Sequence, residues 1–380
     1  MRTFRSFLIV CGILAGSLSL LANDQKPVEK SGANEKALIG PFVYKNLEIY
    51  LIQGKETMPN VDFLTLEEAM KQKILVVHET GDVNKLAVQN VSATKTVFIQ
   101  AGEIVKGGKQ DRTLMTDLIV KPKSGKVNLA AYCVEQGRWQ KRGMENLKAF
   151  SGSSKMVFGK GLRKALKESM KEESADTNSA PVAKKQGEIW KEVAKSQKMM
   201  GMKMGTDVTS KLSSSSLQLT LENKKLKVTT KDYTDKLKPI LKKYPKTIGF
   251  GYMVNGKFST ADSYGSRKLF RKIWPKLLDA AVTEAITDTD KKYKNKLKDD
   301  AGVDSLSKSI GKDAAKGWMG ALFVDGHVQA KKAKSEKYHK RRVNVNKQTK
   351  VDVNEHKDST NYDTLDIENN EFIHRNWEAN

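Results

Sequence analysis

The sequence predicts an α+β protein with an antiparallel β-sandwich or barrel-like core and helices packed on it. Three observations lead to this prediction. Short apolar segments separated by turn residues occupy the chain up to about residue 135, and their alternation is typical of β-strands. Apolar residues recur at helical spacing between about residues 159 and 286. The dipeptide Asn255-Gly256, between two strand-like segments, indicates a tight hairpin.

The first 22 residues have the pattern of a secretory signal peptide. Arg2 and Arg5 precede an apolar run over residues 7–22, which is shorter than a membrane span needs. We therefore expect cleavage after Ala22 and an exported protein, periplasmic or extracellular, with no transmembrane span. A polar N-terminal segment follows over residues 23–40.

Cysteine content restricts the covalent chemistry of the mature chain. Cleavage removes Cys11 and leaves Cys133 alone, so we expect no internal disulfide and no disulfide partner. Cys133 falls at an inward strand position with no histidine near it in sequence. We expect a small buried side chain there, and the alternative is a nucleophile.

The chain is strongly basic, with a formal net charge of +24. This excess favours acidic partners such as nucleic acid, anionic lipid, acidic glycans or a small phosphorylated ligand. The alternative is that the charge provides solubility and general adhesion to an anionic envelope surface.

We expect one main domain over residues 41–290 and a basic C-terminal extension over residues 291–380. Strand patterning in the extension is weak and lies near residues 321–330 and 343–353. The lysine-rich run at 331–342 would bind nucleic acid or an anionic surface if exposed, or is simply a solvated face.

Helix signals are clear within the main domain. Thr65 and Glu68 form the capping-box pattern before a short helix, and Ser266 precedes the most periodic helix of the chain. Further helices are expected over residues 159–173, 187–200 and 231–244.

Two apolar segments predict a hairpin that organises a polar edge. Residues 113–121 and 127–135 have equal length and flank a turn at 122–126. A hairpin centred on Ser124 places Leu114 opposite Val134, Met115 opposite Cys133, and Arg112 opposite Gln136. This register brings GGKQDR (107–112) and EQGRW (135–139) together at one edge of the sheet.

That edge is the predicted site for a small anionic ligand. Backbone amides and side-chain cations there would surround the anion, with an aromatic stacking surface beside it. The predicted ligand-binding residues are Gly107, Gly108, Lys109, Gln110, Asp111, Arg112, Gln136, Arg138 and Trp139. A Walker phosphate loop is excluded because Glu103 and Gln110 occupy positions that need glycine and a hydroxyl residue. The alternative is a structural turn in which Asp111 and Arg112 pair with each other or with the sheet edge.

Few residues suggest a reaction. Glu103 and Glu135 are weak candidates for a catalytic or metal-binding carboxylate pair, and the alternative is ion pairing with Lys109, Arg112 or Arg138. The histidines lack metal-ligand spacing, so no metal site and no cofactor are predicted; they are His78, His327, His339, His356 and His374. The methionines near 199–204 suit Cu(I), or are flexible apolar filler at a helix end; they are Met199, Met200, Met202 and Met204.

Several blocks, taken in order, resemble one known family. They are GGKQDR with CVEQGRW, then GEIWKEVA, then the NG hairpin running into LFRKIWPKLL. Over about residues 47–286 the chain resembles the ARG and Rhodanese-Phosphatase-superfamily-associated domain family. The resemblance implies a contextual link to ADP-ribose metabolism and supplies no catalytic residues.

The sequence thus predicts an exported protein that binds a small anionic ligand, related to phosphate or ADP-ribose, at the GGKQDR/EQGRW edge. Whether the ligand is also processed, and so whether the protein is an enzyme, stays open. Two other classes remain: a non-catalytic envelope or scaffold protein, and a polyanion binder that uses the basic C-terminal extension.

Overall fold

The computed structural model describes residues 37–172, 180–290, 293, 339–355, 359–369 and 371–379. Helices and antiparallel sheets are mixed along the chain, so the predicted α+β class is confirmed. No helix in these ranges is long and apolar enough to cross a membrane. The predicted signal peptide lies outside the described residues.

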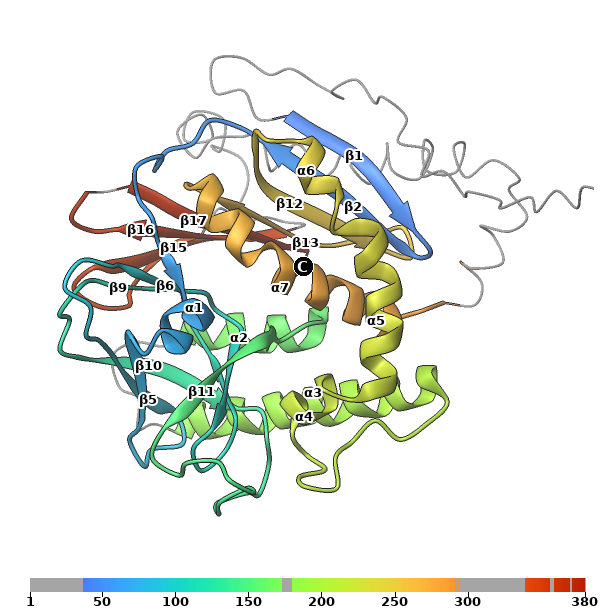
Figure 1. Cartoon of the computed structure of the whole chain (residues 1–380), viewed down its shortest axis with the longest axis horizontal. Helices are drawn as coiled ribbons and strands as arrows, with labels where there is room; N and C mark the ends of the chain where they lie inside the picture. Colours follow the sequence, from blue (N-terminus) through green and yellow to red (C-terminus); the bar gives the residue numbers. More distant parts are fainter. Residues whose placement is uncertain are drawn as a thin grey trace, which may run out of the picture.

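The largest sheet has eight strands and draws on both ends of the described chain (Figure 1). Its order is β1-β2-β12-β13-β17-β16-β15-β14, and every pairing in it is antiparallel. The strands are β1 (Ala37–Tyr44), β2 (Leu47–Gln53), β12 (Thr247–Val254), β13 (Lys257–Tyr264), β14 (His339–Asn344), β15 (Thr349–Glu355), β16 (Ser359–Asp366) and β17 (Glu371–Ala379).

Two smaller sheets are built from the first half of the domain. A six-stranded sheet has the order β11-β7-β8-β10-β5-β4, and a three-stranded sheet has the order β3-β6-β9. Their strands are β3 (Leu64–Thr65), β4 (Leu75–Glu79), β5 (Lys85–Asn90), β6 (Val97–Ile99), β7 (Glu103–Gly107), β8 (Arg112–Leu114), β9 (Leu118–Val120), β10 (Lys126–Cys133) and β11 (Phe150–Met156).

The helices join these sheets into one core. They are α1 (Leu66–Lys71), α2 (Lys160–Glu172), α3 (Ala180–Met204), α4 (Leu217–Leu221), α5 (Lys224–Leu237), α6 (Ile240–Lys243) and α7 (Arg267–Thr287). Helix α7 runs between the eight-stranded sheet and the layer of α2 and α3, and it packs against β11, β12, β13, α3 and α5 (Figure 1). Its apolar residues are buried almost all round, as expected for a helix covered on both sides.

The short-range predictions are confirmed. Thr65 and Glu68 make both hydrogen bonds of the capping box at α1, and the Ser266 hydroxyl accepts from the Leu269 amide at the start of α7. Asn255 and Gly256 turn the β12–β13 hairpin with φ of 51° and 72°, the left-handed conformation that this turn requires.

The predicted hairpin register is wrong. Arg112 pairs with Cys133 and Leu114 with Ala131, three positions away from the register centred on Ser124. The two arms are also not paired along their length, because β9 pairs with β6 while the first part of β10 pairs with β5. The chain leaves the six-stranded sheet between β8 and β9, where the Asp117 carboxylate is held by the Ala101 amide.

The C-terminal strands belong to the main sheet. β17 pairs with β13, and the alternating segment at 343–353 falls on β14 and β15. The expected strand pattern at 321–330 and residues 331–338 of the lysine-rich run lie outside the described residues. The boundary at residue 290 stays a prediction.

Candidate functional site

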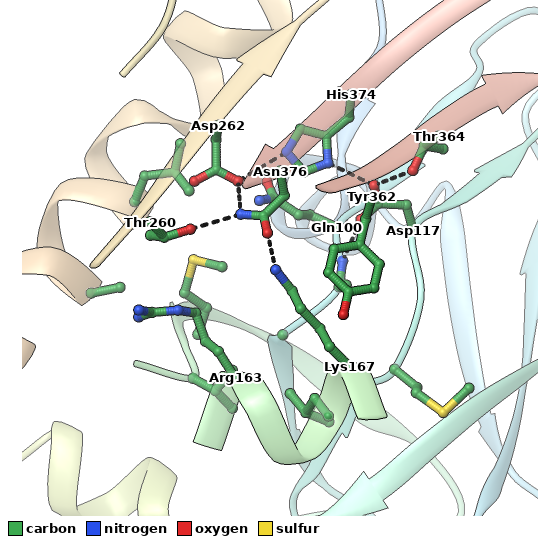
Figure 2. Close-up of a pocket in the computed structure, with 18 of the residues that line it drawn as sticks. Gln100, Asp117, Arg163, Lys167, Thr260, Asp262, Tyr362, Thr364, His374 and Asn376 are labelled. Carbon is green, nitrogen blue, oxygen red and sulfur yellow. Dashed lines mark hydrogen bonds and ion pairs between the residues drawn. The ribbon is translucent and has the colours of Figure 1, made fainter. Parts of the chain in front are cut away.

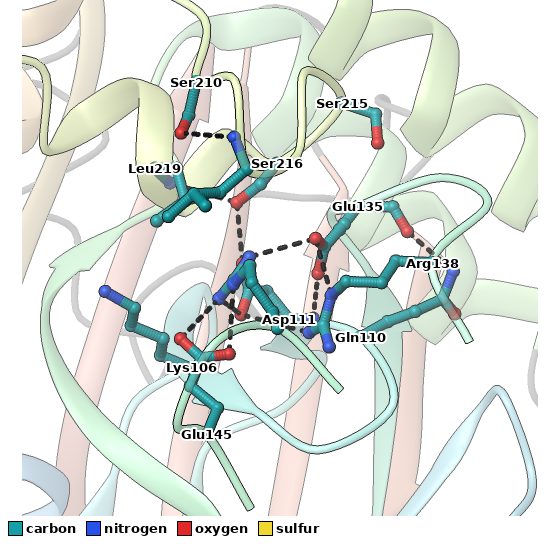
Figure 3. A network of polar contacts seen from close by, with 12 residues as sticks. Lys106, Gln110, Asp111, Glu135, Arg138, Glu145, Ser210, Ser215, Ser216 and Leu219 are labelled. Carbon is teal, nitrogen blue, oxygen red and sulfur yellow. Dashed lines mark hydrogen bonds and ion pairs between the residues drawn. The ribbon is translucent and has the colours of Figure 1, made fainter. Parts of the chain in front are cut away.

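The predicted polar edge forms a compact group of ion pairs, which we call the loop cluster: Asp111, Glu135, Arg138, Arg142 and Glu145 (Figure 3). Arg142 donates to both carboxylate oxygens of Asp111, at 2.9 and 2.8 Å. The Ser216 hydroxyl also donates to Asp111, at 2.7 Å. Burial opposes the charge of Arg142, but Asp111 raises its pKa above the usual value.

Glu135 completes the centre of the loop cluster. It accepts from Nε of Arg138 at 2.7 Å, from Arg142 at 2.9 Å and from the Asp111 amide at 2.9 Å. The other guanidinium nitrogens of Arg138 donate to the carbonyls of Gly107, Gly108 and Gln140. Asp111 and Glu135 have no exposed surface, so these charges are neutralised inside the protein.

The backbone amides predicted to receive an anion have partners within the chain. The Gly107 amide donates to the Asp111 carboxylate and the Lys109 amide to Glu79. The Gly108 amide donates to the carbonyls of Asn146 and Ala149. These contacts favour the alternative of a structural turn.

Two further predicted residues are buried beside the loop cluster. Arg112 donates to the Gln110 carbonyl at 2.9 Å and lies 3.6 Å from the Glu79 carboxylate. Gln110 donates to the Glu135 carbonyl and accepts from the Cys133 thiol. Cys133 has no exposed surface, so the prediction of a small buried side chain is confirmed, and burial raises the pKa of its thiol to about 12.

Only the rim of the predicted edge reaches solvent. Nζ of Lys109 lies 5.7 Å from the centre of the Trp139 ring, and Trp139 is 50% exposed. Gln136 and Gly137 are exposed beside them.

The two candidate catalytic carboxylates serve different ion pairs. Glu103 lies 2.6 Å from Nζ of Lys276 on α7, whereas Glu135 binds Arg138 and Arg142. The predicted Glu135–Arg138 pair is thus present, and the partner of Glu103 was not predicted. Arg142, which pairs with all three carboxylates of the loop cluster, was also missed, although it follows Arg138 by four positions.

A second group of polar residues borders a cavity of about 70 Å³ between α2 and strands β13, β16 and β17 (Figure 2). Most of the cavity wall is apolar. The apolar residues include Met115, Met156, Val157, Leu166, Met170, Phe250, Leu277, Ala280 and Val351.

One end of this wall is a continuous chain of buried polar contacts, which we call the cavity network: Glu284, Arg163, Glu378, Lys167, Asn376, Asp262, His374 and Asp117. His374 lies at its centre, with Nδ1 2.6 Å from Asp117 and Nε2 3.0 Å from Asp262. Burial disfavours the charged ring, but the two carboxylates outweigh it and raise the pKa of His374 to about 9. Both ring nitrogens bind carboxylates, so the charged ring of His374 joins Asp117 to Asp262 and is poorly placed to act as a base.

The α2 side of the cavity network carries two cations one turn apart. Lys167 contacts Asn376, lies 2.8 Å from Glu378 and sits 4.6 Å from the centre of the Tyr362 ring. Arg163 binds Glu378 at 3.0 Å and Glu284 at 2.7 Å. Both cationic side chains are 11% exposed, so they are largely but not completely removed from solvent.

The sequence contained one signal for this site. His374, Asn376 and Glu378 alternate along β17 and therefore point to one face of the sheet. Among the described residues no group of three or more His, Cys, Asp or Glu side chains is arranged to hold a metal ion. The lining instead offers hydrogen-bonding groups at one end and an apolar wall at the other.

The fold and these two groups define an α+β protein with buried ionic networks and one polar-ended apolar cavity. The family model for the ARG and Rhodanese-Phosphatase-superfamily-associated Protein domain matches residues 37–345, and the chain belongs to that family. Comparisons with curated proteins and with solved structures give no match. Strand β17, which supplies His374 and Asn376, lies beyond the matched range, as does β16.

Proposed function

We propose that the protein binds a small organic molecule in the cavity between α2 and the eight-stranded sheet. The observation that carries this proposal is a buried polar network at one end of an otherwise apolar cavity. Binding sites for small molecules typically combine an apolar lining with a few converging polar groups.

The cavity restricts the size of the ligand. Its volume is about 70 Å³, several times the roughly 10–15 Å³ that is needed to hold one water molecule. A short-chain alcohol, aldehyde or ketone matches this volume, whereas a nucleotide such as ADP-ribose is far larger. Three methionines in the wall, Met115, Met156 and Met170, have flexible side chains that adapt to ligands of different shape.

The charges of the cavity network favour a neutral ligand. Four carboxylates, Glu284, Glu378, Asp262 and Asp117, meet three cations, Arg163, Lys167 and His374, which leaves one negative charge in excess when all are ionised. Glu284 and Glu378 do not line the cavity itself, so the charges around it nearly balance, and a neutral ligand avoids the cost of burying an unpaired charge there.

A cavity-filling variant tests the proposal. Ala280 lines the cavity from α7, so Ala280→Leu places additional carbon atoms in the space that the ligand needs. A ligand at about 100 times its dissociation constant stabilises the protein that binds it by about 2.7 kcal/mol. Thermal unfolding with short-chain alcohols should show this stabilisation in the wild type and lose it in Ala280→Leu.

Ala194→Leu is the matched control, because Ala194 is exposed on α3 and away from the cavity lining. It should keep the full stabilisation. Equal stabilisation of Ala280→Leu and the wild type would place the ligand somewhere else.

The predicted anion at the GGKQDR/EQGRW edge is a second candidate, supported by the half-buried Lys109 beside the exposed Trp139 ring. A cation beside an aromatic face suits phosphate or a phosphorylated ring compound. Phosphate-dependent stabilisation that disappears in Lys109→Met and persists in Lys141→Met would support it. Absence of any phosphate effect would contradict this second candidate and favour a structural turn at this edge.

Export rests on the leader sequence. Cleavage after Ala22 predicts that the N-terminal sequence of the secreted protein begins at Asn23. Recovery of an uncleaved chain from the cytoplasm would contradict this proposal.

A further inference from the structure

The amine of Lys167 stands at the wall of the same cavity, and its surroundings suggest a covalent role. Lys167 lines the cavity together with Leu166 and Met170 from the same helix. Its side chain is 11% exposed, so a small molecule that enters the cavity reaches the amine while bulk water has limited access.

Two features of the site favour a reactive amine. Arg163 lies one helical turn before Lys167, and a neighbouring cation disfavours the charged form of an amine. Burial is the largest influence and lowers the pKa of Lys167, although Glu378 acts in the opposite direction. A lower pKa leaves more of the lysine as the free nucleophile near neutral pH.

A proton acceptor is also in place. The Glu378 carboxylate lies 2.8 Å from Nζ of Lys167 and can accept a proton from the ammonium group. Glu378 keeps contacts with Arg163 and Thr260, so its position does not depend on Lys167 alone.

We infer that Lys167 forms an imine with a small neutral aldehyde or ketone bound in the cavity, an inference that rests on the proposed ligand site. Glu378 takes one proton from the ammonium, and the free amine attacks the carbonyl carbon. The carbinolamine then loses its hydroxyl group together with a proton as water, and the C=N bond forms. No oxidant or reductant is needed, because the C=O double bond of the carbonyl compound is replaced by a C=N double bond and one water molecule is released.

The charge balance selects the carbonyl compound. The charges around the cavity nearly balance, so burying the carboxylate of an oxo acid there would be costly, and the volume of about 70 Å³ favours a chain of only a few carbon atoms. Propanal is a suitable probe for both reasons.

The test is reductive trapping of the full chain. The protein is incubated with propanal and cyanoborohydride near neutral pH, and the site of the added propyl group is identified by peptide mass spectrometry. Lys164, which lies on the same helix and is 59% exposed, is the internal comparison. We expect Lys167 to be labelled severalfold faster than Lys164, because its lowered pKa leaves more of the free amine near neutral pH.

Propan-1-ol separates this inference from the proposed function, because it fits the same cavity and cannot form an imine. If propan-1-ol stabilises the protein and protects Lys167 from labelling, both the site and its reactive amine are supported. If propan-1-ol binds but Lys164 is labelled as fast as Lys167, the imine is overturned and the binding site stands. If propan-1-ol does not bind and Lys167 is not preferred, both are overturned.

Discussion

The loop cluster and the cavity network are built from the same kinds of residue and differ in what they surround. In the loop cluster, Asp111 and Glu135 are enclosed by arginines, amides and a hydroxyl, and Arg138 also donates to backbone carbonyls. In the cavity network, Lys167 and Asp262 line an open volume of about 70 Å³. The charges of the loop cluster are therefore satisfied within the cluster, whereas the cavity network leaves some of its polar groups at the wall of a cavity.

The largest effect is expected from breaking the loop cluster. Arg142→Met leaves Asp111 and Glu135 buried without their shared partner, and removing one side of a buried ion pair costs about 3–5 kcal/mol. Urea unfolding should show this loss. Lys141→Met, at the exposed neighbouring position, should stay within about 0.5 kcal/mol of the wild type. A small effect of Arg142→Met would mean that the loop cluster does not hold the loops.

The contacts of charged His374 with Asp117 and Asp262 predict a loss of stability at alkaline pH. Its pKa is raised from 6.5 to about 9, so the stabilisation is complete below about 6.5 and is lost as the pH rises through about 9. The raised pKa of His374 contributes about 3 kcal/mol at most to the free energy of unfolding. Asp117, whose pKa is lowered by His374 against the effect of burial, adds stability that is lost only as the pH falls below the usual range of aspartate.

The measurement compares the wild type with His374→Gln between about pH 6 and about pH 10, which removes the background from other titrating groups. The difference in unfolding free energy should shrink as the pH rises. A difference that stays constant would show that folding does not shift the pKa of His374.

A smaller effect is expected at the cavity. Lys167→Met leaves Glu378 with Arg163 and Thr260 as partners, so the cost should be about 1–2 kcal/mol, the scale of one or two hydrogen bonds. Lys164→Met on the exposed face of α2 serves as the control in the same urea titration. A loss as large as that of Arg142→Met would remove the distinction between the two networks.

The smallest effect is expected at Cys133. Cys133→Ala removes one small buried side chain and its contact with Gln110, for a cost of about 1 kcal/mol. Binding of propan-1-ol should be unchanged in the thermal-shift measurement. Loss of binding in a folded Cys133→Ala protein would connect the thiol to the ligand.

Features set by neighbouring residues could be predicted from the sequence. The capping box of Thr65 and Glu68, the Ser266 cap and the Asn255-Gly256 turn depend on contacts within a few positions, and all three are present. The register between β8 and β10 failed because equal arm lengths suggested one hairpin, whereas β9 leaves to pair with β6.

The candidate sites required long-range contacts that the sequence does not display. Asp117 and His374 are 257 positions apart, and no local pattern connects them. The charged residues of the predicted edge were visible in GGKQDR and EQGRW, but Arg142 and Ser216, which bind the Asp111 carboxylate, lie outside these two segments. The contact of half-buried Lys109 with the exposed Trp139 ring is the part of that edge that matches the predicted cation beside an aromatic surface.

Methionine methyl NMR with propan-1-ol tests the central claim most directly, because methionines report on both regions. Met115, Met156 and Met170 line the cavity, whereas Met144 is 93% exposed in the loop that carries Arg142. The account predicts that the three cavity signals shift together during the titration while the Met144 signal stays in place. A shift of Met144 with the cavity signals unchanged would contradict it.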